Sequence, residues 1–255
     1  MWRLLLNALF PSHCVLCRDP LTQEDVPYLC QSHVRGLPLN QGPRCPRCQL
    51  PFASNEEKNC LDCGEGDWKL KKVVTLYRYE EPFSQTITLF KYDKKRFLIR
   101  TFEALFKEHI LKIKEECESF DLVVPVPLTL LKEKERGFNQ SKLLAVSLAR
   151  LFHKGCCVNA LKRMDRVQGL SQAHLKVGER RENLKNLFSA GRGASRLKGK
   201  RILLVDDVVT TGSTANECVK VLLGTGALEV VLFALARTPL EAQLRRLSSE
   251  KGPSL

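Results

Sequence analysis

The sequence predicts an α/β protein in which helices flank a parallel β-sheet and a small cysteine-rich module comes first. From residue 71 onward, strand-like and helix-like segments alternate, as they do in βαβ units. Residues 202–205 (ILLV) form the continuous apolar run that is typical of a strand buried on both faces. Residues 1–67 differ from the rest, because they hold paired cysteine and histidine positions and show little hydrophobic periodicity.

The predicted strands and helices follow one another in the order that βαβ units require. β-Branched and aromatic side chains mark the first strand, and apolar side chains at helical spacing mark the first long helix. Pro125 and Pro127 end the second strand, and Gly224 stops the last helix. The expected strands are 73–79, 121–126, 200–206 and 228–236, and the expected helices are 97–114, 141–152, 179–188 and 214–223. We expect a solvated loop at residues 189–200 (SAGRGASRLKGK).

Composition limits the class of protein and of partner. The 255 residues, 44% of them hydrophobic, suffice for one α/β domain and a smaller module. The net charge of +13 favours an anionic partner, which is a polyphosphate, a nucleic acid or a membrane surface. No stretch approaches the roughly 20 apolar residues that cross a bilayer. Residues 1–10 (MWRLLLNALF) lack a small-residue cleavage site, so we expect a short packing helix there and not a secretory signal.

The cysteines of the first module are spaced as metal ligands. Two C-x-x-C or C-x-x-H pairs are separated by twelve residues, and two further pairs by eleven, so the second set repeats the first after 30 or 31 residues. Each pair can sit on a tight turn, and two turns complete a tetrahedron around Zn²⁺. The predicted ligands are Cys14, Cys17, Cys30 and His33 for one ion, and Cys45, Cys48, Cys60 and Cys63 for another.

These sites have no open coordination position, so the predicted zinc is structural and not catalytic. One or two zinc ions are expected, and an interleaved pairing of the same eight ligands stays open. Thiolate sites also favour a reducing compartment. The remaining histidines have no partner at ligand spacing and receive no role; they are His13, His109, His153 and His174.

Residues 202–214 (ILLVDDVVTTGST) combine two kinds of recognition in one segment. Asp206 and Asp207 lie at the carboxyl end of a strand, where open α/β sheets bind ligands, and can accept hydrogen bonds from vicinal ribose hydroxyls. After Val208, the loop Thr210, Thr211, Gly212, Ser213 and Thr214 enters a helix, whose N-terminal N–H groups favour a phosphate. A ribose diol and a 5′-phosphate together make a phosphoribosyl group.

A pyrophosphate group needs a second binding element. Residues 123–128 (VVPVPL) end another strand of the same sheet, and we expect a basic loop to follow it. Lys132 and Lys134 in this loop are equally well explained as solvated charges. Arg136, in the stretch RGFNQ, is the predicted anion contact.

The segment 202–214 resembles the phosphoribosyl pyrophosphate (PRPP) motif of type I phosphoribosyltransferases. Together with the cysteine-rich module and VPVP…RGFNQ, it makes nearly the whole chain similar to the ComF family, which groups the competence protein ComF with GntX-like proteins. Further matches to the family are Lys91, Gln172, Arg180, Asn183, Phe188, Arg237 and Thr238. Departures are His33, where many members have cysteine, and the stretch before Gln172, which leaves Arg163, Arg166 and the rival Gln168 without a clear match.

The resemblance implies a zinc finger at residues 1–67, a phosphoribosyltransferase domain at 68–240 and a short tail at 241–255. It implies transfer of a phosphoribosyl group from PRPP, bound with Mg²⁺, to an acceptor that the sequence does not name. Asp206, Asp207 and Arg136 are the expected catalytic residues, with Lys91 as a further PRPP contact. The family also implies a cytoplasmic role with single-stranded DNA in natural transformation, beside competence or recombination proteins.

Two other classes of function stay open. A binding protein would hold PRPP or a nucleotide without turnover, while the basic stretches 91–96, 132–136 and 192–201 follow a single-stranded DNA backbone. Aromatic residues make up only 7% of the chain, which weakens the base-stacking part of that argument. An adaptor would use its zinc module to dock another protein, although the intact acidic pair argues for a retained ligand.

Overall fold

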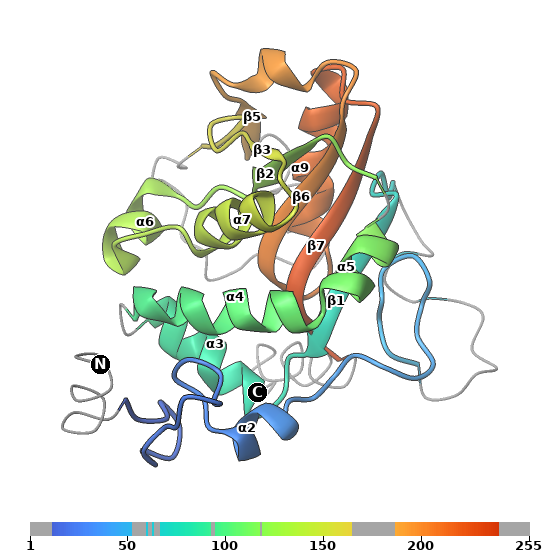
Figure 1. The fold of residues 1–255 in the computed structure, drawn as a ribbon. Helices are drawn as coiled ribbons and strands as arrows, with labels where there is room; N and C mark the ends of the chain where they lie inside the picture. The colour runs from blue at the N-terminus through green and yellow to red at the C-terminus, as the bar shows by residue number, and fades with distance from the viewer. Residues whose placement is uncertain are drawn as a thin grey trace, which may run out of the picture.

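The computed structural model describes residues 12–52, 60, 63, 67–92, 95–117, 119–164 and 187–239 (Figure 1). A five-stranded, entirely parallel sheet forms the centre, in the order β1-β7-β6-β2-β3. The strands are β1 (Lys72–Arg78), β2 (Leu122–Pro125), β3 (Gly155–Cys156), β6 (Arg201–Val209) and β7 (Glu229–Arg237). The predicted α/β class and the four predicted strands are confirmed. β6 is longer than expected, because it continues through Asp206 and Asp207 to Val209.

Helices cover both faces of the sheet. The helices α3 (Phe83–Tyr92), α4 (Ile99–Glu108), α5 (Ile110–Cys117) and α7 (Gln140–Leu151) pack on one face, and α9 (Ser213–Gly224) packs on the other. Side chains of β7 alternate between these two cores, since Val231 and Phe233 enter one and Val230 and Leu232 the other. Within the described ranges, no helix combines the length and apolar character that spanning a membrane requires.

Several helices differ from the expectation. The predicted helix 97–114 is a 3-10 turn, η1 (Arg96–Leu98), followed by α4 and α5, which are separated at His109. The His109 ring bonds the Tyr77 hydroxyl over 2.9 Å, between Nε2 and Oη, so a contact with the sheet accompanies this break. Helix α3 was not foreseen. A second unforeseen helix, α6 (Leu130–Arg136), replaces the predicted basic loop; Thr129 caps its start and Gly137, with φ of +78°, ends it.

The region after α7 also corrects the sequence reading. Phe188 was expected to end a helix, but it begins β5 (Phe188–Ala190), which pairs with β4 (Leu161–Arg163). The expected loop at 189–200 contains this strand and η3 (Ala194–Leu197), whose Ala194 and Leu197 are buried. Other predictions lie outside the described residues: the helices at 1–10 and 179–186, the tail at 241–255, and the positions Arg166, Gln168, Gln172, His174, Arg180 and Asn183.

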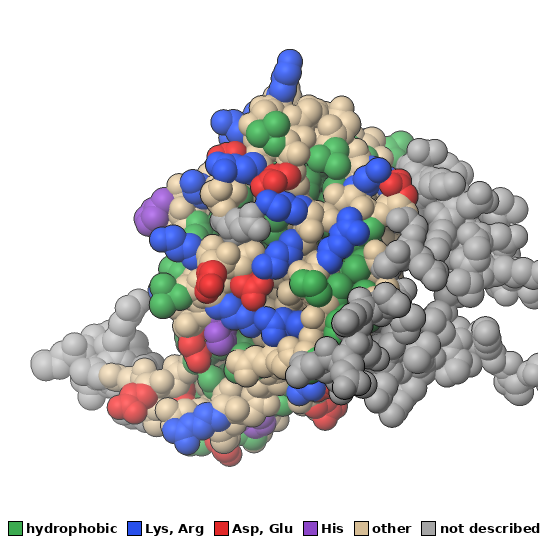
Figure 2. Space-filling view, turned by 90° about the vertical axis from the view of Figure 1, so that its right-hand side faces the viewer, with side chains coloured by type: hydrophobic (Ala, Val, Ile, Leu, Met, Phe, Trp, Pro, Cys, Tyr) green, Lys and Arg blue, Asp and Glu red, His purple; other side chains and the backbone are tan. Residues whose placement is uncertain are grey.

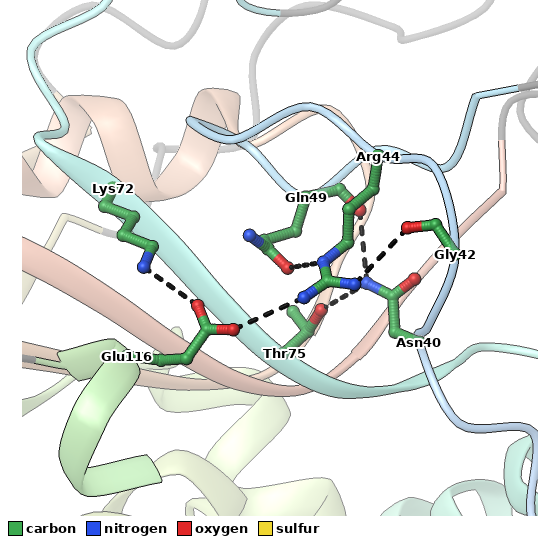
Figure 3. Close-up of polar contacts among 7 residues, drawn as sticks. All are labelled: Asn40, Gly42, Arg44, Gln49, Lys72, Thr75 and Glu116. Carbon is green, nitrogen blue, oxygen red and sulfur yellow. Dashed lines mark hydrogen bonds and ion pairs between the residues drawn. The ribbon is translucent and has the colours of Figure 1, made fainter. Parts of the chain in front are cut away.

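The segment before the second cysteine cluster is fastened to the sheet and to α5 (Figure 3). Asn40 is completely buried, and its amide Nδ2 donates to Gln49 O over 3.1 Å and to Thr75 Oγ1 over 2.8 Å. The Glu116 carboxylate on α5 pairs with Arg44 at 3.3 Å and with Lys72 at 2.8 Å. These contacts join the N-terminal module to the α/β domain through groups that are at least partly buried.

We expect Glu116→Gln to lower the free energy of unfolding by about 1–2 kcal/mol at pH 7, between the values of exposed and buried pairs. Partial burial alone would raise the pKa of Glu116, but the hydrogen bond and charge of Lys72, and then the charge of Arg44, lower it below its usual 4.5. A carboxylate whose pKa is lower in the folded state stabilises that state at pH values above its unfolded-state pKa. This stabilisation is lost as the pH falls through the folded-state pKa.

Chemical denaturation of wild type and Glu116→Gln at several pH values checks this. The difference between the two proteins should shrink as the pH falls below 4.5. A difference that stayed constant down to pH 3 would mean that the carboxylate charge is not the stabilising element.

Candidate functional site

The strand order reverses at one place in the sheet, and the carboxyl edge between β2 and β6 at this switch point is called the crevice below. The chain moves outward from β2 to β3 on one side and from β6 to β7 on the other, so the direction reverses between β2 and β6. In open α/β sheets, ligands bind outside the carboxyl ends of the strands at such a reversal. The segments that leave β2 and β6 at this edge are residues 126–139 and 210–212. They contain the stretches that the sequence singled out.

Asp206 and Asp207 occupy the end of β6 at this crevice. Ser141 Oγ, at the start of α7, donates to Asp206 Oδ1 over 2.8 Å, and the backbone N–H of Asp207 donates to the same oxygen over 2.9 Å. Burial, followed by the neighbouring carboxylate of Asp207, raises the pKa of the Asp206 carboxyl from 3.8 to about 7. Asp207, taken as a whole residue, is only 8% exposed. Two adjacent acids of this kind, one half-buried and one buried, are a candidate site for a hydroxyl-bearing or cationic ligand.

Lys91, near the end of α3, forms an ion pair with Asp207. Its Nζ lies 2.8 Å from Asp207 Oδ1, and the two side chains are 15% and 11% exposed. The structure therefore brings the predicted Lys91 directly to the carboxylates. A ligand that binds Asp207 through Oδ1 has to share this oxygen with the ammonium group or displace it.

The predicted phosphate loop connects β6 with α9. Val208 is partly buried in β6, and Thr210 and Thr211 are exposed. Gly212 is buried with φ of +72°, a left-handed conformation that favours glycine, and its carbonyl accepts the Asn216 N–H over 2.8 Å. Ser213 begins the helix, and its hydroxyl lies 2.9 Å from Thr211 Oγ1. With Thr214 in the first turn, the loop presents hydroxyls and N–H groups at the positive end of a helix dipole.

Arg136 ends helix α6 near the same edge. It donates to Gln140 Oε1 over 3.1 Å, and its guanidinium lies 4.9 Å from the centre of the Tyr92 ring. Gln140 in turn donates to Lys91 O over 3.4 Å, which links Arg136 to the segment holding the ammonium group. The neighbouring Lys132 and Lys134 are exposed on α6. The described contacts therefore connect Arg136, and not these lysines, to the crevice.

Three contributors were missed from the sequence: Ser141, Gln140 and Tyr92. The first two directly adjoin or belong to RGFNQ, the stretch in which Arg136 alone was predicted as a contact. Asn139 in the same stretch caps α7 and donates to Val126 O over 3.1 Å, so it holds the exit of β2. The polar residues 139–141 at the start of a predicted helix were therefore the signal that could have identified Gln140 and Ser141. Tyr92 had no comparable signal, because its position depends on the unforeseen α3.

We expect Lys91→Met to lower the free energy of unfolding by about 3 kcal/mol at pH 8, because it leaves a largely buried carboxylate without its cation. The Lys91 charge also lowers the pKa of Asp206, so its loss should raise that pKa further and Asp206 should take up a proton more readily. The stability deficit should therefore diminish at pH 5. Thermal unfolding at both pH values tests this, and an equal deficit at both would contradict the electrostatic cause.

Two clusters of metal-binding side chains lie in the N-terminal module. One consists of Cys14, Cys17, Cys30 and His33, and the other of Cys45, Cys48, Cys60 and Cys63; within each cluster, the ligand atoms all lie within 4.8 Å of one another. The pairing in the structure is therefore sequential along the chain and not interleaved. The short helix α2 (Gln31–Arg35) carries His33 into the first cluster.

The distances fit tetrahedral zinc. Zinc–sulfur bonds of about 2.3 Å at tetrahedral angles separate two sulfurs by about 3.8 Å. The Sγ atoms are 3.8 Å apart for Cys17 and Cys30, 3.5 Å for Cys45 and Cys63, and 3.3 Å for Cys48 and Cys60. His33 directs Nδ1 toward the sulfurs, at 3.1 Å from Cys30 and 3.6 Å from Cys14. Four soft donors in each cluster suit structural zinc.

Comparison with known protein families identifies both parts of the chain. Residues 5–64 match the double zinc ribbon domain, and residues 140–249 match the phosphoribosyl transferase domain. The parallel sheet flanked by helices agrees with the second match, and the paired cysteine clusters agree with the first.

Relatives extend over nearly the whole chain. Competence protein F from Haemophilus influenzae is 32% identical over 89% of this chain and 98% of its own length. The DNA utilization protein YhgH from Escherichia coli K12 is 31% identical over the same shares. Competence protein ComFC from Bacillus subtilis is 27% identical over 88% of this chain and 95% of its own.

Proposed function

Since this chain belongs to the ComF family of competence proteins, we propose that it binds PRPP and transfers the phosphoribosyl group to an acceptor with loss of pyrophosphate. One observation carries the proposal. The two carboxylates at the end of β6 continue without a break into a glycine-containing loop at the N-terminus of α9. A diol-binding pair next to a phosphate-binding loop suits a ribose 5-phosphate moiety.

In this proposal each group of the crevice has one task. Asp206 and Asp207 accept hydrogen bonds from the ribose 2′- and 3′-hydroxyls, and the loop 210–214 holds the 5′-phosphate. The nucleophilic atom of the acceptor forms a bond to C1′ while the bond from C1′ to the pyrophosphate oxygen breaks. Pyrophosphate leaves with the bonding electrons, and Arg136 and Lys91 stabilise its charge.

Mg²⁺ is the cofactor that these residues suit. Two adjacent carboxylates offer the oxygen ligands that Mg²⁺ prefers, together with oxygens of the substrate. A bound Mg²⁺ would neutralise negative charge on the leaving pyrophosphate. Lys91 already neutralises part of the charge of the pair, and its ammonium group has to move or share Asp207 when a cation enters.

The test is calorimetric titration of the zinc-loaded full chain with PRPP and Mg²⁺, with pyrophosphate release followed in the same samples. Binding together with release on adding an acceptor, such as a nucleobase or an amine, would support the transferase. Binding without release for a panel of such acceptors would favour a sensor that holds PRPP without turnover. Absence of binding by folded protein would overturn the proposal.

A second function, binding of single-stranded DNA, is favoured by the relatives and by charge. One relative is named a DNA utilization protein and two are competence proteins, and the net charge of this chain is +13. Figure 2 shows Lys and Arg side chains spread over one face, with Asp and Glu side chains among them. We propose that such a face follows the phosphate backbone in the service of DNA uptake, beside competence or recombination proteins.

Salt dependence separates this function from the first. Affinity for a single-stranded oligonucleotide that falls steeply with salt, and is the same in Asp207→Asn, would support an electrostatic DNA face apart from the crevice. Affinity that Asp207→Asn alters strongly would place the DNA in the crevice instead.

We also propose the cytoplasm as the location, because zinc thiolates persist in a reducing compartment, and all eleven cysteines are free of disulfides.

A further inference from the structure

The short segment between the second zinc cluster and β1 lies against the start of α9. Asn216, in the first turns of that helix, donates from Nδ2 to Asp67 O over 2.7 Å and accepts the Lys69 N–H at Oδ1 over 2.7 Å. These two bonds hold the backbone on either side of Trp68. Asn216 itself is only 9% exposed, so the pair of bonds is shielded from solvent.

The Trp68 ring packs directly on the phosphate loop. A Cβ atom at Gly212 would lie 2.4 Å from the indole Cη2 and 2.9 Å from Cζ3, so only glycine leaves room for the ring. The indole N–H is buried and forms no hydrogen bond with any residue that the structure describes. The contribution of Trp68 at this place is therefore the shape of its ring.

Arg237, at the end of β7, makes a second connection between the same parts. It is completely buried; its Nε donates to Cys48 O over 3.1 Å, and its Nη1 donates to Val209 O over 3.2 Å. Cys48 belongs to the second zinc cluster, and Val209 is the residue just before the phosphate loop. Arg237 thus links the second cluster to Val209, while Trp68, which follows this cluster in the chain, lies on Gly212.

The first zinc cluster lies in a different environment. Thr101 Oγ1 on α4 donates to Pro27 O over 2.6 Å, and the Tyr28 ring lies 4.5 Å from the Phe97 ring. These contacts belong to the core on the α3–α4 face, whereas the cysteines of the second cluster belong to the core on the α9 face. The two clusters therefore adjoin different hydrophobic cores, and the described contacts of the loop run to the side of the second cluster.

We propose that Trp68 is a positioning residue for the phosphoribosyl site: its ring holds Gly212 and the adjoining N–H groups in the arrangement that binds the 5′-phosphate. Ligand affinity then depends on zinc in the cluster of Cys45, Cys48, Cys60 and Cys63, and not on zinc in the cluster of Cys14. This inference rests on the proposed binding of a phosphoribosyl group, and it extends the site into the zinc ribbon.

Ribose 5-phosphate is the probe, because it carries only the diol and the 5′-phosphate. By calorimetry, Trp68→Ala should bind it at least about tenfold more weakly than wild type, since a loop displaced by a fraction of an ångström loses aligned hydrogen bonds. Trp68→Phe, which keeps a ring, should recover most of the affinity. Equal affinity of folded Trp68→Ala and wild type would overturn the inference, whereas failure of wild type to bind would overturn the proposed function instead.

A direct readout leaves Trp68 itself unchanged. The chain has two tryptophans, so Trp2→Phe leaves Trp68 as the sole indole fluorophore. Its emission should shift on saturation with ribose 5-phosphate, because the ring contacts the loop that binds the charged phosphate. Unchanged emission under conditions where calorimetry shows binding would count against the inference.

The zinc clusters supply a matched pair of variants. Cys14→Ser and Cys45→Ser each remove a buried thiol that begins a cluster. We expect Cys45→Ser to lose at least about tenfold in affinity for ribose 5-phosphate and Cys14→Ser to remain within about twofold of wild type. The reverse order, or equal losses, would overturn the asymmetry between the clusters.

Discussion

Asp206→Asn is expected to weaken PRPP binding by at least about 100-fold, because it removes a charged acceptor from the proposed diol site. The same substitution should stabilise the ligand-free protein. Its carboxyl has a pKa raised to about 7, so the folded state binds a proton more tightly than the unfolded state does. The stability that protonated Asp206 contributes is fully present below its unfolded-state pKa of 3.8 and is lost as the pH rises through about 7. The variant escapes this loss.

The gain in the free energy of unfolding should be about 1–2 kcal/mol at pH 8, the range found when a functional group is relieved of an unfavourable environment. It should grow as pH rises from 4 to 7 and then level off. Calorimetric titration and thermal unfolding of the same samples measure both effects. A loss of affinity accompanied by a loss of stability would indicate a structural acid and not a ligand-binding one.

Asp121→Asn is the matched control, because Asp121 lies beside the opposite, amino end of β6. Its carboxylate pairs with Arg201 at 3.1 Å, and the hydrogen bonds from that residue lower the pKa of Asp121 to about 2. We expect this variant to be somewhat less stable at neutral pH and to keep full affinity for PRPP. The two substitutions are thus expected to change the free energy of unfolding in opposite directions, and only Asp206→Asn should weaken PRPP binding.

Loss of a zinc ligand is the second large effect that we expect. Cys48→Ser should lower the zinc content from two ions per chain to one and cost more than about 5 kcal/mol of stability, since metal binding in such modules is a large part of their folding free energy. Its backbone carbonyl also holds the buried Arg237, so a disordered ribbon would leave that guanidinium with fewer partners.

Elemental analysis of zinc and thermal unfolding measure this effect. Cys117→Ser serves as the control, because Cys117 is equally buried but lies outside both clusters and should leave the zinc content unchanged. Two zinc ions retained by Cys48→Ser would contradict the assignment of this thiol as a ligand. Serine is a poor zinc ligand at neutral pH, so the substitution removes one donor with little change in volume.

Local patterns were sufficient for the strands and for the segment 202–214. A buried parallel strand has an apolar run that no surface segment shares, and the ligand-binding part follows it directly in the chain. Patterns failed where an element depends on its neighbours. The break at His109 accompanies a contact with Tyr77 on the sheet, and β5 exists because Phe188 pairs with Arg163 across the chain. Neither partner is visible from local periodicity.

The sequence by itself determined the α/β class, the two sets of cysteine ligands and the contiguous 206–214 segment, because strand burial, turn spacing and a continuous motif are all local properties of the chain. The tertiary structure alone decided the remainder. It brought Lys91 to Asp207 and Trp68 to Gly212, and it set the two zinc clusters against different hydrophobic cores. Both contacts join residues that are more than a hundred positions apart in the chain. The order of the strands in the sheet, which local patterns do not reveal, brings such residues together.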